Sequence, residues 1–165
     1  MDLRREGSGL WHAVHGGTLN HPERLAVGPG GRLFVADTGN HRVAVFDTAQ
    51  DGPGQFPLAA TIGGEGTEPG RFREPKDVAL GPGGDLYVAD YGNNRIQVFQ
   101  AELDGSYTAV PGRTIGDLAG PVAIAVDREG RVYVGEMGGP GVAAEGIKVF
   151  GPDGNPLACA TCPNK

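Results

Sequence analysis

The sequence has little of the chemistry that cross-links small domains. Only two cysteines occur in its 165 residues, Cys159 and Cys162, and both lie within the last seven positions. A disulfide-stabilised fold would spread its cysteines along the chain, so these two do not hold the fold together. Serine is equally scarce: the chain has only Ser8 and Ser106, and neither lies in a Gly-x-Ser-x-Gly nucleophile motif.

Two further absences narrow the class of partner. The formal net charge is −6 and there is no run of Lys or Arg, whereas nucleic-acid binding normally shows as a basic patch. No apolar stretch approaches the roughly 18 residues of a membrane-spanning helix. Residues 1–6 lack the apolar core of a signal peptide. These features disfavour nucleic-acid binding and predict a soluble, cytoplasmic protein with no membrane partner.

Glycine, in contrast, is abundant, with 30 glycines and 13 prolines in the chain, against a usual glycine share of about 7%. Disordered glycine-rich chains lack regular β-branched runs. Here Leu-Phe-Val at 33–35, Leu-Tyr-Val at 86–88 and Val-Tyr-Val at 132–134 recur in matching contexts. The glycines are therefore expected in turns between short strands, and the fold class is predicted to be all-β.

The chain aligns with itself. Residues 22–46 recur as 75–99 at a constant offset of 53, and a third copy begins at Pro121. In the third copy Glu136 takes the aspartate position, Gly146 takes the arginine position, and five extra residues fall within 138–144. A period of about 40 to 55 residues with several strands per unit is typical of β-propeller blades.

Each repeat is predicted to form a four-stranded antiparallel meander. In the first repeat we expect strands at 24–27, 33–36, 43–46 and 58–62. Gly-Pro-Gly-Gly at 28–31 makes the first turn, and Thr-Gly-Asn-His at 38–41 makes the second, with its glycine and asparagine in left-handed conformations. Alternation along 33–36 directs side chains toward both neighbouring blades.

Three blades leave a propeller incomplete. Propellers typically close with four to eight blades, so three would leave two apolar lateral faces uncovered. The remaining blades either belong to a longer chain or come from a second copy, giving a homodimer that completes a six-bladed ring. A stretch at 10–14 resembles an outer strand that could complete the last blade. We expect an N-terminal tail at 1–7, repeats over 8–157 with blade cores at 22–62, 75–115 and 121–157, and a C-terminal tail at 158–165.

The repeat motif resembles that of a known family. Leu-Phe-Val-Ala-Asp-Thr-Gly-Asn-His-Arg-Val at 33–43 and Leu-Tyr-Val-Ala-Asp-Tyr-Gly-Asn-Asn-Arg-Ile-Gln-Val-Phe at 86–99 are similar to the core of NHL repeats. Gly-Arg-Phe-Arg-Glu-Pro at 70–75 resembles the lead-in to each inner strand. The resemblance covers roughly residues 8–155. It implies a propeller of six blades, a number that the spacing itself does not give.

A carboxylate and an arginine flank the second hairpin loop of the first two repeats. These pairs are Asp37 with Arg42 and Asp90 with Arg95. The aspartate is expected to accept backbone N–H bonds in the turn while the arginine bridges to it. A catalytic residue has no reason to recur in every blade, so we interpret both pairs as structural. Glu136 has no matching arginine, which predicts weaker bracing in the third repeat.

The histidines do not form an evident metal site. His12 and His15 are three apart, and on a strand they would point to opposite faces. His21 and His41 lie in loops and would need a third ligand from another blade. We therefore expect polar surface residues, and neither a metal nor another cofactor.

The tail sequence Cys-Ala-Thr-Cys at 159–162 has the spacing of redox pairs, zinc knuckles and haem attachment sites. Pro163 stands where haem attachment needs a histidine, and no further zinc ligands lie nearby. The pair is interpreted as two thiols on a tail, or as half of a metal site if the chain continues.

Two sets of loops are predicted to share one face of the propeller: those entering the inner strands and those of the second hairpins. Variable polar and aromatic residues on a rigid frame suit a recognition surface. We expect a non-catalytic binding or scaffold module that recognises a protein or peptide. The binding-face candidates are His21, Arg73, Lys76, His41, Tyr91, Asn94 and Met137.

An enzymatic alternative stays open. By resemblance, six-bladed relatives include lactonases and the lyase that cleaves peptidyl-α-hydroxyglycine, which use a metal in or near the central channel. Zinc or calcium would be expected only under this alternative. Such a site takes ligands from several blades, and the sequence shows no clear His/Asp/Glu constellation that would supply them.

Overall fold

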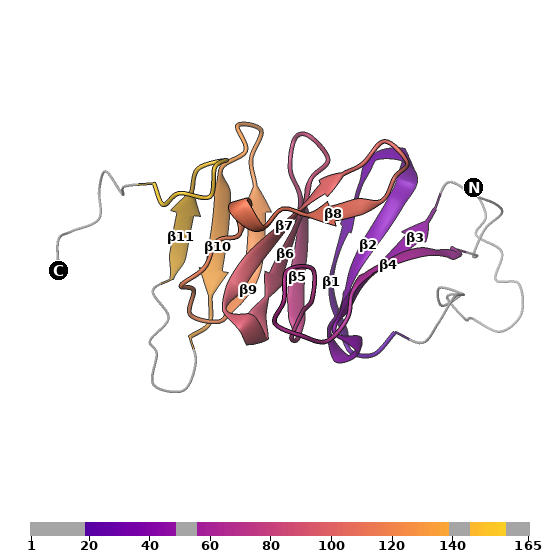
Figure 1. The fold of residues 1–165 in the computed structure, drawn as a ribbon, viewed down its shortest axis with the longest axis horizontal. Helices are drawn as coiled ribbons and strands as arrows, with labels where there is room; N and C mark the ends of the chain where they lie inside the picture. Colours follow the sequence, from indigo (N-terminus) through magenta and orange to yellow (C-terminus); the bar gives the residue numbers. More distant parts are fainter. Residues whose placement is uncertain (1–18, 49–55, 139–145, 158–165) are drawn as a thin grey trace, which may run out of the picture.

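The computed structural model describes residues 19–48, 56–138 and 146–157. They form three antiparallel sheets that stand side by side in chain order (Figure 1). Blade 1 consists of β1 (Pro22–Val27), β2 (Arg32–Asp37), β3 (Arg42–Asp47) and β4 (Leu58–Gly63). Blade 2 consists of β5 (Pro75–Leu80), β6 (Leu86–Asp90), β7 (Arg95–Ala101) and β8 (Tyr107–Ala109). Blade 3 consists of β9 (Pro121–Val126), β10 (Val132–Glu136) and β11 (Ile147–Phe150). The predicted all-β class and partial propeller are confirmed.

Each blade is a meander in which successive strands pair, with β1, β5 and β9 at one edge of their sheets. The first turn follows the glycine-proline signature: Gly30 and Gly31 have φ of 70° and 77°. In the second hairpin loop the expectation was wrong in detail. The left-handed residues are His41 (φ 53°) and Asn94 (φ 54°), one position after the predicted asparagine. A short 3-10 turn at Thr38–Asn40 places the reversal there.

The third blade differs from the predicted four-stranded meander. Its sheet has three strands among the described residues, and the place of the fourth is marked by a bridge between Phe150 and Pro156 and by the hydrogen bond from Leu157 N to Val149 O (2.9 Å). Proline has no N–H, so Pro156 cannot donate to a ladder at that point. Pairing therefore stays at single contacts within the described range.

The apolar core lies between the blades. Each strand sends alternate side chains to opposite sides of its sheet, and buried residues gather at both junctions. The junction of blades 1 and 2 buries Phe34, Ala36, Val43, Val45, Ile62, Phe72, Val78, Leu86, Val88 and Phe99. The junction of blades 2 and 3 buries Tyr87, Ala89, Ile96, Val98, Ile115, Leu118, Val132, Val134 and Phe150.

A third, smaller cluster covers part of the far side of blade 1. Val35, Ala44 and Phe46 are buried there, with Leu19 and Phe56 among the residues packed against them. Residues 33–36 thus alternate between the two sides of the blade, as predicted. The stretch at 10–14, the N-terminal histidines and both cysteines lie outside the described residues.

Helix in the described ranges is confined to three-residue 3-10 turns. None of them has the length or apolar character needed to cross a membrane.

Candidate functional site

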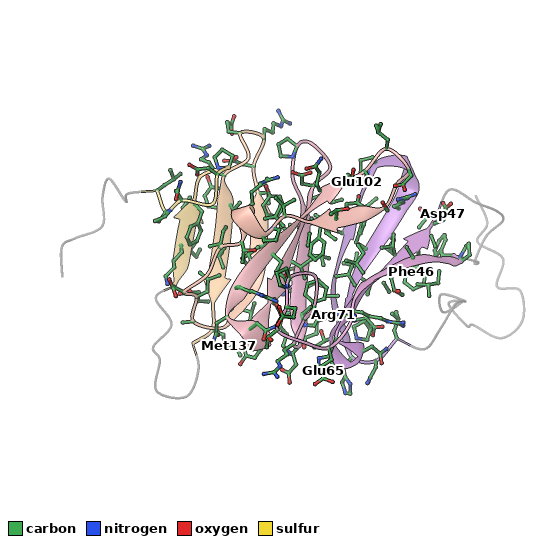
Figure 2. The ribbon with its side chains drawn as sticks, viewed as in Figure 1. Phe46, Asp47, Glu65, Arg71, Glu102 and Met137 are labelled. Atoms are coloured by element: carbon green, nitrogen blue, oxygen red, sulfur yellow. The ribbon has the colours of Figure 1, made fainter. Side chains whose placement is uncertain are left out.

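The lead-in loops and second hairpin loops meet at one end of each blade, and we call this surface the loop face. It comprises 19–21 with 38–41 in blade 1, 71–74 with 91–94 in blade 2, and 117–120 with 137–138 in blade 3. Met137 and Glu65 lie toward this end of the molecule, whereas Glu102 lies at the other (Figure 2). Three features define the geometry of the loop face: a carboxylate, a glycine and a left-handed residue.

The recurring carboxylate holds the lead-in loop of its own blade. Asp37 Oδ1 accepts the Asn20 amide at 2.7 Å, and Asp90 Oδ1 accepts the Arg73 amide at 2.8 Å. In blade 3, Glu136 Oε1 accepts the Ala119 amide at 2.7 Å. Each acceptor is a buried carboxylate at the end of the second strand. A buried carboxylate must be paired and hydrogen-bonded, so these side chains are committed to the frame.

The other oxygen of each aspartate meets the predicted arginine. Arg42 Nε lies 2.7 Å from Asp37 Oδ2, and Arg95 Nε lies 2.7 Å from Asp90 Oδ2. Gln97 donates a further bond to Asp90 Oδ2 at 3.0 Å. The two aspartate side chains are fully buried while the arginines remain partly exposed.

In blade 3 a lysine takes over the cation, and the sequence analysis missed it. Lys148 Nζ lies 3.1 Å from Glu136 Oε1, although Gly146 occupies the arginine position. Lys148 pairs with Val134 across the sheet and is thus a diagonal neighbour of Glu136. The signal was a lysine two residues beyond the missing arginine, on the same side of its strand. Glu136 Oε2 is buried without a hydrogen-bond partner among the described residues.

Glycine allows the two loops of a blade to touch. Gly39 N donates to Asn20 O and Gly92 N donates to Arg73 O, both at 2.8 Å. A Cβ on residue 92 would lie 2.7 Å from Arg73 Cβ and 3.0 Å from its carbonyl oxygen. Any larger residue would push the loops apart, so glycine is required for this close approach.

The left-handed residue of each hairpin contacts the following blade. His41 Nδ1 accepts the Glu74 amide at 3.1 Å, and Asn94 Oδ1 accepts the Gly120 amide at 3.1 Å. Thr38 Oγ1 adds a buried bond to Pro75 O at 2.6 Å. Two of the predicted binding-face residues, His41 and Asn94, therefore contribute to the junctions between blades. Sequence reasoning could not reveal this, because neither blade's own pattern shows which amide lies opposite.

Other predicted residues lie at the rim of the loop face. Arg73 and His21 are exposed, and Met137 is 61% exposed. Lys76 extends from β5 to Glu23 of blade 1 (Nζ to Oε1, 2.6 Å) and lies 5.5 Å from the centroid of the Tyr91 ring. The predicted set is thus brought to one end of the molecule, but only part of it presents unpaired chemistry to solvent.

A buried carboxylate that the sequence analysis did not single out links blades 2 and 3. Asp77 on β5 accepts the Val78 amide through Oδ1 and the Ile124 amide through Oδ2, both at 2.8 Å. Burial raises the pKa of Asp77 above its ordinary value, and the two amide bonds and the charge of Arg24 oppose this only in part. A carboxylate with such a shift can mark a reactive site, but here both oxygens bind backbone of neighbouring strands.

The chemistry for metal binding is sparse in this part of the chain. Across residues 19–48, 56–138 and 146–157, no three His, Cys, Asp or Glu side chains come together as metal ligands. A cleft of about 580 Å³ between β4 and β8 contains one carboxylate, that of Asp104. Hydrogen bonds from Ser106 lower the pKa of Asp104. One ionised carboxylate does not supply the acid and base pair that hydrolysis requires.

Comparison with known proteins places these repeats. The NHL repeat family profile matches residues 19–46 and 72–99, which are the first two repeats. NHL repeat-containing protein 3 from Homo sapiens is 33% identical over 85 residues, covering 51% of this chain and 23% of that protein.

Two solved structures share the fold. A gluconolactonase from Xanthomonas campestris is 20% identical with a TM-score of 0.55, covering 90% of this chain and 49% of that chain. A virginiamycin B lyase from Staphylococcus aureus is 13% identical with a TM-score of 0.54, covering 85% of this chain and 41% of that chain. Likeness at this level of identity concerns the fold alone. The chain spans about a quarter of the length of the human relative and less than half of either structure.

Proposed function

We propose that this member of the NHL repeat family is a non-catalytic binding module that recognises a protein or peptide through the loop face. The observation that carries the proposal is the division of labour on that face. The recurring carboxylates and the left-handed residues hold backbone amides in place. Arg73 and Met137 remain exposed beside them. A rigid frame with exposed loop side chains lowers the entropy cost of recognition.

The exposed side chains also indicate the kind of partner. Arginine, methionine and tyrosine are enriched in the centres of protein interfaces, and Arg73, Met137 and Tyr91 lie on this face. Lys76 lies over the Tyr91 ring and adds a positive charge nearby. The chemistry fits a peptide segment that carries an apolar side chain next to a carboxylate.

A peptide-display selection tests the proposal. The wild-type chain is used to select from a random dodecapeptide library, and enriched peptides are then measured against Arg73→Glu and Met137→Glu by fluorescence anisotropy. We expect each substitution to weaken binding about tenfold or more, the effect of losing about 1.4 kcal/mol at a contact.

The matched control is Arg128→Glu. Arg128 is an exposed arginine in the turn between β9 and β10, at the opposite end of blade 3. Its reversal should leave peptide affinity unchanged. Peptides that tolerate both loop-face substitutions, or that lose affinity equally with the control, would refute recognition through this face.

The rival function is enzymatic. It rests on the fold shared with a gluconolactonase and a lyase. A metal site of that kind would have to take ligands from outside the described residues, because those residues hold no cluster of three. Elemental analysis after dialysis separates the two functions: stoichiometric zinc or calcium retained by the protein would favour the enzyme over the binding module.

A further inference from the structure

Exposed apolar side chains gather on the two lateral ends of the row of blades. Among the described residues, the largest exposed apolar groups include Leu25 (63%) and Val27 (72%) on blade 1, and Ile147 (73%) and Leu157 (45%) on blade 3. Contiguous exposed apolar surface of this kind marks a contact site. The two ends lie on opposite sides of the molecule (Figure 1).

The two built junctions show what such surfaces bind. The side of a blade that meets the next blade is here called its leading face, and the side that meets the previous blade its trailing face. The leading face of blade 1 centres on Phe34 and Val43, and it packs on Val78 and Phe99 of the trailing face of blade 2. The leading face of blade 2 centres on Tyr87 and packs on the trailing face of blade 3 in the same way.

Both uncovered ends keep the residue types of the built faces, position by position. Strand pairing aligns four leading positions: Phe34, Tyr87 and Tyr133; Ala36, Ala89 and Gly135; Val43, Ile96 and Ile147; Val45, Val98 and Val149. It aligns five trailing positions: Leu25, Val78 and Ile124; Val27, Leu80 and Val126; Leu33, Leu86 and Val132; Val35, Val88 and Val134; Phe46, Phe99 and Phe150. The leading face of blade 3 therefore matches the trailing face of blade 1 as the built pairs match each other.

The backbone at the trailing end of blade 1 also has the conformation used at the built junctions. There the lead-in residues Glu74 (φ 47°) and Gly120 (φ 63°) donate their amides to the preceding blade. The corresponding residue of blade 1 is His21, whose φ is 48°. Its amide is thus held in the conformation that a preceding blade would use.

We propose that a second copy of this chain covers both ends, with the leading face of blade 3 in each copy packed on the trailing face of blade 1 in the other. A second copy is favoured over an unrelated partner because this chain already presents both halves of the contact. Head-to-tail contacts close into a ring when the rotation allows it, and two copies would give six blades, within the usual range for propellers. Leu19 and Phe56 cover the outer half of the trailing face, so the new contact centres on Leu25 and Val27 of β1.

Light scattering after size exclusion tests the mass. We expect a species of twice the chain's 17.0 kDa. Leu25→Lys and Ile147→Glu should each give a monomer, because each places a charge at both junctions of the dimer. Leu103→Lys is the matched control: Leu103 is fully exposed in the loop between β7 and β8, and its substitution should leave the dimer mass unchanged.

Mixing the two variants tests the head-to-tail geometry. A mixture of Leu25→Lys and Ile147→Glu should recover the dimer mass, because one junction is then unaltered and the other has a lysine and a glutamate. A folded wild-type monomer at about 100 µM, a concentration at which even a micromolar complex forms, would overturn the proposal. So would a dimer that both variants leave intact, or a mixture that stays monomeric while circular dichroism shows both variants folded.

Discussion

Asp90 and Glu136 occupy the same position in successive blades, yet they are held by different partners. Asp90 binds the Arg73 amide, the Arg95 guanidinium and the Gln97 amide group. Glu136 binds the Ala119 amide and Lys148, and its second oxygen is buried without a hydrogen-bond partner among the described residues. The backbone amide is common to both, while the cation is exchangeable. The comparison indicates that the carboxylate is kept to fix the lead-in loop, and that the cation compensates its charge.

The largest expected difference between the two blades concerns the apolar anchor of the lead-in loop. Phe72 is fully buried at the junction of blades 1 and 2, with its ring centroid 5.6 Å from that of Phe99, and its counterpart in the next repeat is Leu118. We expect Phe72→Ala to lower the free energy of unfolding by about 3–5 kcal/mol, and Leu118→Ala by an amount near the lower end of about 2–5 kcal/mol. Urea denaturation measures both, and a larger loss in Leu118→Ala would contradict the ranking.

The carboxylates themselves come next. Asp90→Ala strands the Arg95 charge and several donors, so we expect a loss of about 3–5 kcal/mol. Glu136→Ala removes one amide bond and a half-satisfied carboxylate, so we expect about 1–3 kcal/mol. Equal losses in thermal or urea unfolding would show that the extra partners of Asp90 contribute nothing.

Lys148 provides a test of the exchangeable cation. Lys148→Met should leave Glu136 without its counter-charge and lower stability by about 1.5 kcal/mol. Lys148→Arg should retain nearly all of it, because a guanidinium can also reach the carboxylate. The control is Arg131→Met, whose arginine pairs with Asp127 at the exposed surface and should cost well under about 1 kcal/mol.

The smallest expected effect is the pH dependence that Asp77 adds at the junction of blades 2 and 3. Burial raises its pKa in the folded state, so the folded protein holds this proton more tightly than the unfolded chain. Its stabilising contribution is complete below about pH 4 and is lost as pH rises through the raised value, with a slope of at most about 1.4 kcal/mol per pH unit. The difference in unfolding free energy between wild type and Asp77→Asn should fall over that window. A difference that rises with pH would reverse the sign.

The sequence predicted the parts of the fold that depend on local pattern. Repeats, strand positions and the glycine-proline turns follow from the residues within one blade, and Asp37 and Asp90 stood out because they recur. Contacts that depend on where two blades meet were not predictable in this way. His41 accepts an amide 33 residues away, and Asp77 one 47 residues away. Lys148 was missed because the compensation moved to a diagonal position while the alignment searched the arginine's own place.

Amide hydrogen exchange at the lead-in loops tests most directly whether the recurring carboxylates fix the loop face. Asn20, Arg73 and Ala119 lie in surface loops, yet each donates its amide to a buried carboxylate. We expect slow exchange at all three by NMR, and in Asp90→Asn faster exchange at Arg73 with protection at Asn20 unchanged. Fast exchange at all three amides in the wild-type protein, as in an ordinary exposed loop, would contradict the fixed loop face and the binding role proposed for it.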